Sequence, residues 1–201
     1  MSMHHFLKNI LNRICQVIVL PLAFLCWVEE RIAGASETIF HMCTHIVAIL
    51  PGLPGVFLRR AFYSLTLSRC SLNCHIGFGS LFTHRNAVVE DHVYMGVYCI
   101  IGSARLRKKT LIGSRVSIVS GKEHHSLDAQ GEWTPFDPRR ITQVTVGPNV
   151  WVGEGALIMD DVGEGSLVGA GAVVSSRVRA HVVVAGNPAR FIRVLRDPGT
   201  S

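Results

Sequence analysis

Long uninterrupted hydrophobic runs are missing from this chain of 201 residues. The most apolar segment, residues 14–28, contains Gln16 and is interrupted by Pro21. It is shorter than the roughly 20 apolar residues that a membrane-spanning helix needs. No small-residue cleavage site follows it, and charged residues 29–31 come directly after it, so we expect no secretory signal peptide.

Close cysteine pairs are absent as well. The six cysteines stand at positions 15, 26, 43, 70, 74 and 99, and no two of them form a CxxC pair. The two that lie closest in the sequence are Cys70 and Cys74. Such a spread is typical of free thiols, buried or partly buried, in the reducing cytosol.

Nucleic-acid-binding motifs are a third absence. The formal net charge is +6 and the isoelectric point is about 9.3, which favours an anionic ligand, a membrane surface or a nucleic acid. The chain has no helix-turn-helix, zinc-finger or RNA-binding motif, and its basic residues are scattered. We therefore expect no nucleic-acid partner, and a phosphate-bearing ligand or anionic lipid headgroups remain.

What the chain does contain is a six-residue repeat, clearest over residues 146–193. Aliphatic residues recur every six positions, except for one step of four from Ile158 to Val162, and Gly follows most of them. A helix needs a period near 3.6 and a strand alternates every two residues, so this pattern fits neither alone. It predicts short parallel strands that are joined by tight corners and wound into a solenoid. The aliphatic side chains that should point inward are Val146, Val152, Ile158, Val162, Val168 and Val174.

The same repeat begins at residue 76 and is interrupted once. It slips by one residue before Val89 and again, we expect, at the basic segment 107–110. Residues 120–143 break it entirely, and a long loop on a rigid scaffold usually carries function. Alternation at 65–67 predicts the first strand. Residues 190–195 are expected to form a short helix, and 196–201 a flexible tail.

Residues 1–58 are expected to form an apolar helical extension, and 59–195 the repeat domain. One interpretation is an in-plane or re-entrant membrane anchor, because basic residues flank the apolar stretches. Another is a helical lid that packs on the end of the solenoid or on a neighbouring subunit, and a third is a two-pass membrane protein. The flanking basic residues are Lys8, Arg13, Arg59 and Arg60.

The repeat resembles that of the hexapeptide-repeat acyltransferases. Five units in near-continuous register and the ending VVVAGNPARFIRVL (182–195) carry this resemblance. It implies an all-β solenoid, a left-handed parallel β-helix with a helical N-terminal extension and a short C-terminal helix. The handedness rests on the resemblance, since parallel crossovers are usually right-handed. The resemblance also implies acetyl-CoA as the acyl donor and a homotrimer.

The order of motifs along the chain resembles the bacterial exopolysaccharide and capsule sugar O-acetyltransferases. The motifs are an apolar N-terminus, LPGLPG, LRRAFY, the repeat, the SGKEHHS loop and AGNPAR. This implies a sugar or lipid-linked oligosaccharide as acceptor, in exopolysaccharide or capsule biosynthesis. It also implies a cytoplasmic location, peripheral at the inner face of the cytoplasmic membrane.

The loop holds the candidate catalytic base. Acyl transfer from a thioester to a hydroxyl needs a base with a pKa near neutrality, which His supplies. The maltose and galactoside acetyltransferase group has a His–x–Leu–Asp element in this loop, and His125 and Asp128 match it here. The resemblance therefore makes His125 the base, with His124 as the alternative. Asp128, Glu123 or a carboxylate from a neighbouring subunit would orient the imidazole, and Asp128 is also a candidate to contact the acceptor. The other interpretation is that both histidines are solvated loop residues without a catalytic role.

The resemblance places acetyl-CoA against the last coils, in a groove between adjacent subunits. Backbone N–H groups at Gly-containing corners can bind the pantetheine amides, and arginines can bind phosphates. The alternative explanation of the glycines is corner geometry alone, and that of Arg190 is capping of the solenoid. The short step after Ile158, and the absence of a Lys that the family often has near residue 176, are departures. The matching positions are Glu154, Ala170, Ser175, Ser176, Arg190 and Arg193.

Histidines in the first coils have two interpretations. His84 or Asp91 can line the acceptor groove, although both are also typical of exposed corners. His75, His84 and His92 can suggest zinc, as in the related γ-class carbonic anhydrases. The Asn-Ile-Gln-Asp pattern of those enzymes is absent, so we expect no metal.

Together these features predict an acetyl-CoA-dependent O-acetyltransferase that acts on a sugar hydroxyl. One alternative is an N-acetyltransferase that acts on an amino sugar or nucleotide-sugar. Others are a serine-type acetyltransferase, whose relatives end similarly but lack this His–x–Leu–Asp element, a γ-carbonic anhydrase, and a solenoid adaptor without enzymatic activity.

Overall fold

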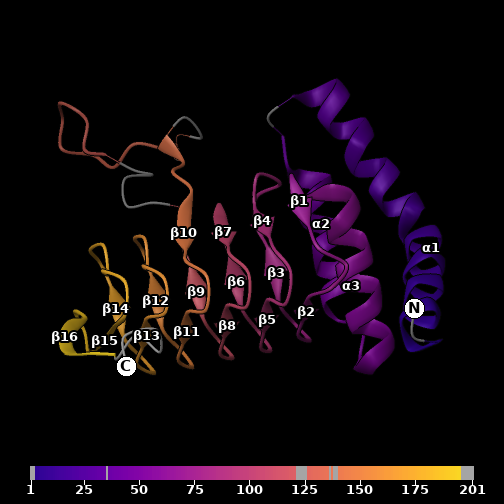
Figure 1. Ribbon diagram of the computed structural model, residues 1–201. Helices are drawn as coiled ribbons and strands as arrows, with labels where there is room; N and C mark the ends of the chain where they lie inside the picture. Colours follow the sequence, from indigo (N-terminus) through magenta and orange to yellow (C-terminus); the bar gives the residue numbers. More distant parts are fainter. Residues whose placement is uncertain (1–2, 35, 121–125, 136, 138–139, 196–201) are drawn as a thin grey trace.

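The computed structural model describes residues 3–34, 36–120, 126–135, 137 and 140–195. Three helices come first in the chain, α1 (Met3–Ala33), α2 (Thr38–Ala48) and α3 (Gly52–Thr66). Figure 1 shows them at one end of the molecule, with α1 as the outermost element and the strands following in regular rows toward the C-terminus. The helices therefore cover the first coil of the β structure.

The rest of the chain is a parallel β-solenoid with three faces, consistent with a left-handed β-helix. Face A consists of β1 (Arg69–Cys70), β4 (Val88–Val89), β7 (Ala104–Leu106) and β10 (Val144–Val146). Face B consists of β2 (His75–Ile76), β5 (Tyr94–Met95), β8 (Leu111–Ile112), β11 (Trp151–Val152), β13 (Leu167–Val168) and β15 (Val182–Ala185). Face C consists of β3 (Leu81–Phe82), β6 (Ile100–Ile101), β9 (Ser117–Ile118), β12 (Leu157–Ile158) and β14 (Val173–Val174). Val162 and Val178 continue face A through isolated parallel bridges.

The six-residue period is confirmed by the burial of the inward side chains. All six aliphatic residues predicted to point inward, from Val146 to Val174, are at most 2% exposed. A Cβ built on Gly153 would lie 2.5 Å from the backbone nitrogen of Ala170 in the next coil. Glycine is therefore needed there because successive corners approach too closely for any side chain.

Irregularity in the repeat is confined to one edge of the solenoid. Every step from face A to face B, and from face B to face C, covers six residues, as from Val89 to Met95 to Ile101. Steps from face C back to face A vary in length, and the interrupting loop leaves the solenoid here as well. We call this edge the C–A edge. Its steps run from Phe82 to Val89, Ile101 to Leu106, Ile158 to Val162 and Val174 to Val178, which are seven, five, four and four residues.

Several expectations about local structure are wrong. Residues 65–67 are not a strand, because α3 continues to Thr66 and passes the expected boundary at residue 58. The second slip lies between Ile101 and Leu106, and residues 107–110 belong to a regular step. The short step after Ile158 is not unique, since Val174 to Val178 repeats it.

The C-terminal segment is the other correction. Residues 190–195 were expected to be helical, but β16 (Arg190–Val194) runs antiparallel to β15. Its five residues are all exposed. The strand form is favoured because β15 otherwise presents an unpaired edge at the end of face B.

The helical extension is attached to the solenoid by buried arginines. Arg59 is completely buried; its Nε donates a hydrogen bond to the carbonyl of Ile76 in β2 (2.9 Å), and its Nη1 donates one to the carbonyl of Leu50 (2.6 Å). Arg60 donates two hydrogen bonds to the Asn12 side chain of α1, at 3.0 and 2.5 Å. Both arginines therefore face the protein interior and cannot contact lipid headgroups, contrary to the membrane-anchor interpretation of these two residues.

Candidate active site

The loop that interrupts the repeat leaves and rejoins the solenoid at the C–A edge. Its two ends, residues 120 and 141–142, lie together, and we call them the neck of the loop. The N–H of Thr142 donates to the carbonyl of Ser120 (2.8 Å), and the Ser120 hydroxyl accepts a hydrogen bond from the N–H of Ser103 in the preceding coil (2.7 Å). The part of the loop that the structure describes contains a small hairpin, with a bridge between Leu127 and Trp133. The loop therefore begins and ends at one fixed point of the solenoid.

The predicted base lies outside the described residues, as do His124 and Glu123. Asp128 is described, and it organises the tip of the hairpin. One of its carboxylate oxygens accepts hydrogen bonds from the N–H groups of Gln130 and Glu132, each at 2.9 Å. This contact accounts for Asp128 as a turn residue, so its role toward an imidazole stays a prediction.

An imidazole–carboxylate pair lies at the same edge, two coils before the loop. His84 follows β3, and its Nδ1 donates a hydrogen bond to Glu37 at the start of α2 (2.6 Å). The other carboxylate oxygen accepts the N–H of Arg85 (2.8 Å). Burial raises the pKa of Glu37, but the hydrogen bonds from His84 and Arg85 outweigh it and leave that pKa below its usual value. The ionised carboxylate thus holds the His84 ring with its proton on Nδ1.

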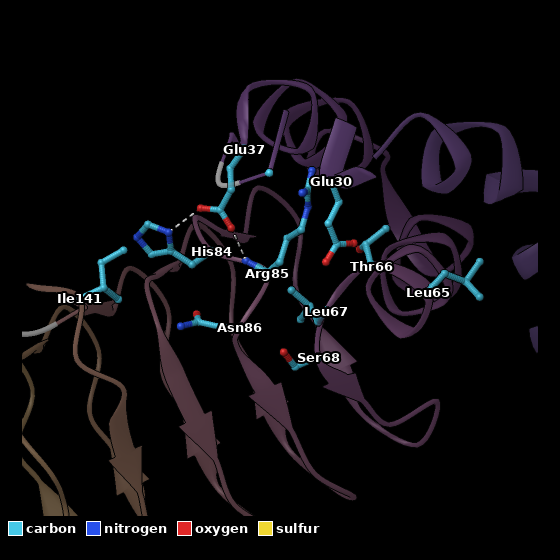
Figure 2. A pocket seen from close by; sticks show the side chains of 11 residues that line it. Glu30, Glu37, Leu65, Thr66, Leu67, Ser68, His84, Arg85, Asn86 and Ile141 are labelled. Atoms are coloured by element: carbon cyan, nitrogen blue, oxygen red, sulfur yellow. Dashed lines mark hydrogen bonds and ion pairs between the residues drawn. The ribbon is translucent and has the colours of Figure 1, made fainter. Parts of the chain in front are cut away.

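Two cavities meet at His84. The first, about 500 Å³, lies between the helical extension and the first coils (Figure 2), and the second, about 410 Å³, lies on the outer surface of face C. Figure 2 shows the His84 ring between Glu37 and Ile141 of the loop's return segment. Both cavities touch the neck of the loop, since Ile141 lines the first and Ser120 the second. The other polar residues around the first cavity are Glu30, Thr66, Ser68, Arg85 and Asn86.

A second carboxylate stabilises the helices that form one side of the first cavity. Glu29 of α1 accepts hydrogen bonds from the N–H groups of Ile39 and Phe40 in the first turn of α2, at 2.8 and 3.1 Å. It also forms an ion pair with Arg85. Burial raises the pKa of Glu29, but these hydrogen bonds dominate and lower it. Sequence reasoning missed this network because its members are far apart in the chain.

The residues predicted to bind acetyl-CoA border the last coils but do not meet at one point. Glu154 and Ala170 lie on successive coils at the corner between faces B and C, where the N–H of Gly171 donates to the Glu154 carbonyl (2.8 Å). The exposed residues Ser175 and Ser176 lie across face C, at the C–A edge. Arg190 and Arg193 are on β16, beyond face B. Together they frame the C-terminal part of face C and the end of face B.

Other candidates are placed away from His84. Asp91 lies at the corner between faces A and B, where it accepts a hydrogen bond from Ser71, so the structure does not bring it to the cavities. His75 stacks on Tyr94 on the outside of face B, and His92 is exposed beside Asn73. Among the described residues, no three His, Cys, Asp or Glu side chains gather as a metal site would require.

Comparisons with known proteins give relatives in sequence. The chain is 30% identical over 129 residues to the galactoside O-acetyltransferase of Escherichia coli K12, covering 62% of this chain and 56% of that protein. It is 32% identical over 124 residues to WbbJ of the same organism, provisionally named a lipopolysaccharide biosynthesis O-acetyl transferase, covering 58% and 62%. The chain thus spans less than two thirds of the length of either relative. No family model matches it.

Solved structures give the same fold. A hexapeptide-repeat acetyltransferase from Vibrio cholerae superposes with a TM-score of 0.59 at 20% identity, covering 82% of this chain and 96% of that one. A galactoside acetyltransferase in complex with coenzyme A superposes with a TM-score of 0.60 at 21% identity, covering 80% and 82%. The resemblance that the period of six and the AGNPAR ending predict is therefore confirmed: in sequence the chain is similar to O-acetyltransferases, and its fold is that of a solved hexapeptide-repeat acetyltransferase.

Proposed function

We propose that this chain is an acetyl-CoA-dependent O-acetyltransferase that acts on a sugar hydroxyl. The observation that carries the proposal is the similarity to two O-acetyltransferases, one acting on galactosides by its name and one named for lipopolysaccharide biosynthesis. The geometry adds support, because the histidine loop emerges at the edge where the two cavities meet.

The reaction needs one base and one oxyanion donor. His125 removes the proton from the acceptor hydroxyl, and the oxygen attacks the thioester carbonyl of acetyl-CoA. A corner N–H group stabilises the tetrahedral oxyanion. The intermediate then collapses, the C–S bond breaks, and the imidazolium returns the proton to the departing thiolate, giving the acetyl ester and CoA. No covalent acyl-enzyme is required, because both substrates are held side by side.

In this proposal the acceptor occupies the cavity beside His84. A sugar offers many hydroxyl groups, and the cavity wall offers carboxylate, imidazole and amide groups that can bind them. The hydrogen bond to Glu37 fixes the orientation of the His84 ring in the cavity wall. The donor would lie along face C toward Ser175 and Ser176, with its phosphates near Arg190 and Arg193.

A homotrimer is also part of the proposal, because two faces of the solenoid are apolar on the outside. Tyr94, Leu111 and Trp151 lie in register along face B and are 46–54% exposed. Face C presents Ile100, which is 51% exposed, and Leu157, and both line the cavity on that face. Face A presents Arg69 and Arg105 instead. Neighbouring copies that cover faces B and C would close the grooves in which the substrates lie.

The acceptor is proposed to be a sugar or a lipid-linked oligosaccharide at the inner face of the cytoplasmic membrane, in exopolysaccharide or capsule biosynthesis. The name of the WbbJ relative supports a cell-surface polysaccharide. A transfer to an amino group is the alternative. Hydroxylamine treatment of the labelled product separates the two, because it cleaves esters and leaves amides intact.

The test is a panel of acyl-CoAs and sugar acceptors with detection of the released thiol. His125→Ala should lower kcat by at least about a hundredfold while the KM for acetyl-CoA stays within about twofold. His124→Ala is the matched control, since it removes the neighbouring imidazole. Equal CoA release by wild type and His125→Ala would refute the assignment of the base. Zinc found by elemental analysis would instead favour the carbonic anhydrase alternative.

A further inference from the structure

Helix α1 packs on the protein through one face that mixes apolar and polar side chains, and it leaves a second, apolar face exposed. Asn12 is buried against Arg60, and the Gln16 amide donates a hydrogen bond to the Ser64 hydroxyl of α3 (2.9 Å). Glu29, which is 5% exposed, caps α2. The opposite side of the helix is exposed and also apolar, whereas a surface helix usually exposes a polar side. Its exposed apolar residues are Leu7, Ile10, Leu11, Ile14, Val17, Ile18, Leu20, Phe24, Leu25, Trp27 and Ile32.

This surface is continuous and free of charge over its central part. Between Arg13 and Glu30, all of which the structure describes, every exposed residue is apolar. Val17 is 69% exposed, and Leu53 on the adjoining α3 is 72% exposed. A cavity of about 400 Å³ between α1 and α3 adds to it, with an entirely apolar lining that includes Cys15. A soluble monomer rarely exposes so long an apolar stripe to water.

We infer that this surface lies flat on an anionic lipid bilayer, with α1 in the plane of the membrane. Charge complementarity supports lipid as the occupant, because cations stand at the two ends of the stripe. Arg13 is exposed at one end, and Arg31 is exposed at the other, with its guanidinium 5.1 Å from the ring centre of Trp27. An in-plane helix of this kind buries its apolar face at the acyl boundary and pairs its cations with headgroups. Figure 1 shows α1 as the outermost element at the helical end of the molecule.

By length and composition alone, residues 7–33 are apolar enough to cross a membrane. The contacts of α1 argue against a spanning arrangement. A spanning α1 would have to leave the body, and this would strip Arg60 of Asn12 and Arg85 of Glu29. Separating a buried charge from its partner is strongly unfavourable. In the in-plane arrangement these contacts stay intact while the outer face enters the lipid.

The membrane surface and the acceptor cavity share one helix. Glu30 and Gly34, at the C-terminal end of α1, line the cavity beside His84. A bilayer under α1 therefore lies beside the cavity in which we propose the acceptor sugar. The membrane inference does not rest on the proposed acetyl transfer, because it follows from the exposed face of α1 alone.

The experiment is flotation of the full chain with vesicles of about 30% phosphatidylglycerol in phosphatidylethanolamine. The variant Val17→Glu/Phe24→Glu places two charges on the exposed face, away from the contacts that attach α1. Its matched control, Val194→Glu/Phe191→Glu, makes the same exchanges on exposed residues of β16 at the other end of the solenoid. Wild type and control should float, and the α1 variant should bind at least about tenfold more weakly. Circular dichroism and thermal unfolding confirm that the variants are folded.

Three outcomes would overturn the inference. One is that the α1 variant floats like wild type. Another is that wild type fails to float; a mass in the absence of lipid above that of the α1 variant would then assign the face to a second copy of the chain. The third is that cell membranes retain wild type after alkaline carbonate extraction, because a spanning helix resists it. Acetyl transfer to a soluble sugar should be unchanged in the α1 variant, so failure of the proposed function is seen separately.

Discussion

Glu37 is the residue whose role the structure defines most sharply. It comes from the helical extension, yet it holds an imidazole of the first coils through a 2.6 Å hydrogen bond. If the cavity beside His84 binds the acceptor, Glu37→Gln should raise the KM for the acceptor about tenfold, because a charge-assisted hydrogen bond contributes roughly 1.5–3 kcal/mol. The KM for acetyl-CoA should stay unchanged. Steady-state kinetics with each substrate varied in turn measures both.

The matched control for this substitution is Glu90→Gln. Glu90 likewise contacts a basic side chain, that of Arg107 (2.8 Å), and accepts a backbone N–H, that of Lys108 (3.0 Å), but it lies outside both cavities. It should leave both KM values within about twofold. Equal effects of the two substitutions on the acceptor KM would show that Glu37 acts only through stability, and the acceptor would then lie elsewhere.

At the scale of elements, the period of six predicted the strands, their inward residues and the parallel solenoid. It could not predict that all irregular steps fall on one edge, since a slip in sequence does not reveal which corner absorbs it. The contacts that attach the helices could not be predicted either, because partners such as Glu29 and Arg85 are 56 residues apart in the sequence. The helix expected at 190–195 is a strand, because the free edge of β15 outweighs local preference.

The attachment of the helical extension should depend on pH through Glu29. Its folded-state pKa is lowered, so the stabilisation is present above the ordinary carboxyl pKa of about 4.5 and is lost as the pH falls through the folded value. Glu29→Gln should lower the free energy of unfolding at pH 7 by roughly 3 kcal/mol, because it breaks a nearly buried ion pair. Urea unfolding monitored by circular dichroism at pH 7 and pH 4 measures this. If the variant loses as much stability between pH 7 and pH 4 as wild type does, the acid sensitivity belongs to other groups.

The corners of the coil make a second prediction at this scale. Gly153→Val should destabilise the solenoid by roughly 1–3 kcal/mol, since the added carbon atoms meet the backbone of Ala170 in the next coil. Gly155→Asn is the matched control two residues away. Gly155 has a positive φ of 69° and open space around it, and Asn tolerates this conformation. Thermal unfolding should separate the two variants, and similar losses in both would mean that backbone conformation dominates at this corner.

At the scale of the whole molecule, the faces of the solenoid differ enough to predict assembly. Face B presents Leu111 and Trp151 in register, both about half exposed, whereas face A presents charged side chains such as Arg105. If neighbouring copies cover face B, burying these two residues contributes several kcal/mol to each contact. Leu111→Glu/Trp151→Glu should then convert a trimer into monomers, as measured by sedimentation equilibrium. Acetyl transfer should fall with it, because the proposed donor groove needs a second copy.

Arg105→Glu on face A is the control for this assembly. It reverses the charge of an exposed residue on β7, and it should leave the mass of the assembly in sedimentation equilibrium unchanged. A wild-type chain that sediments as a monomer and is fully active would contradict the trimer and confine both substrates to grooves within one chain. A trimer that resists Leu111→Glu/Trp151→Glu would instead assign the contact to face C or to the helical extension.

Helix α1 lies across the solenoid axis at one end (Figure 1), so a trimer formed through the faces would present three such helices to the same bilayer. Vesicle binding should therefore weaken when Leu111→Glu/Trp151→Glu breaks the assembly, because three linked contacts bind more tightly than one.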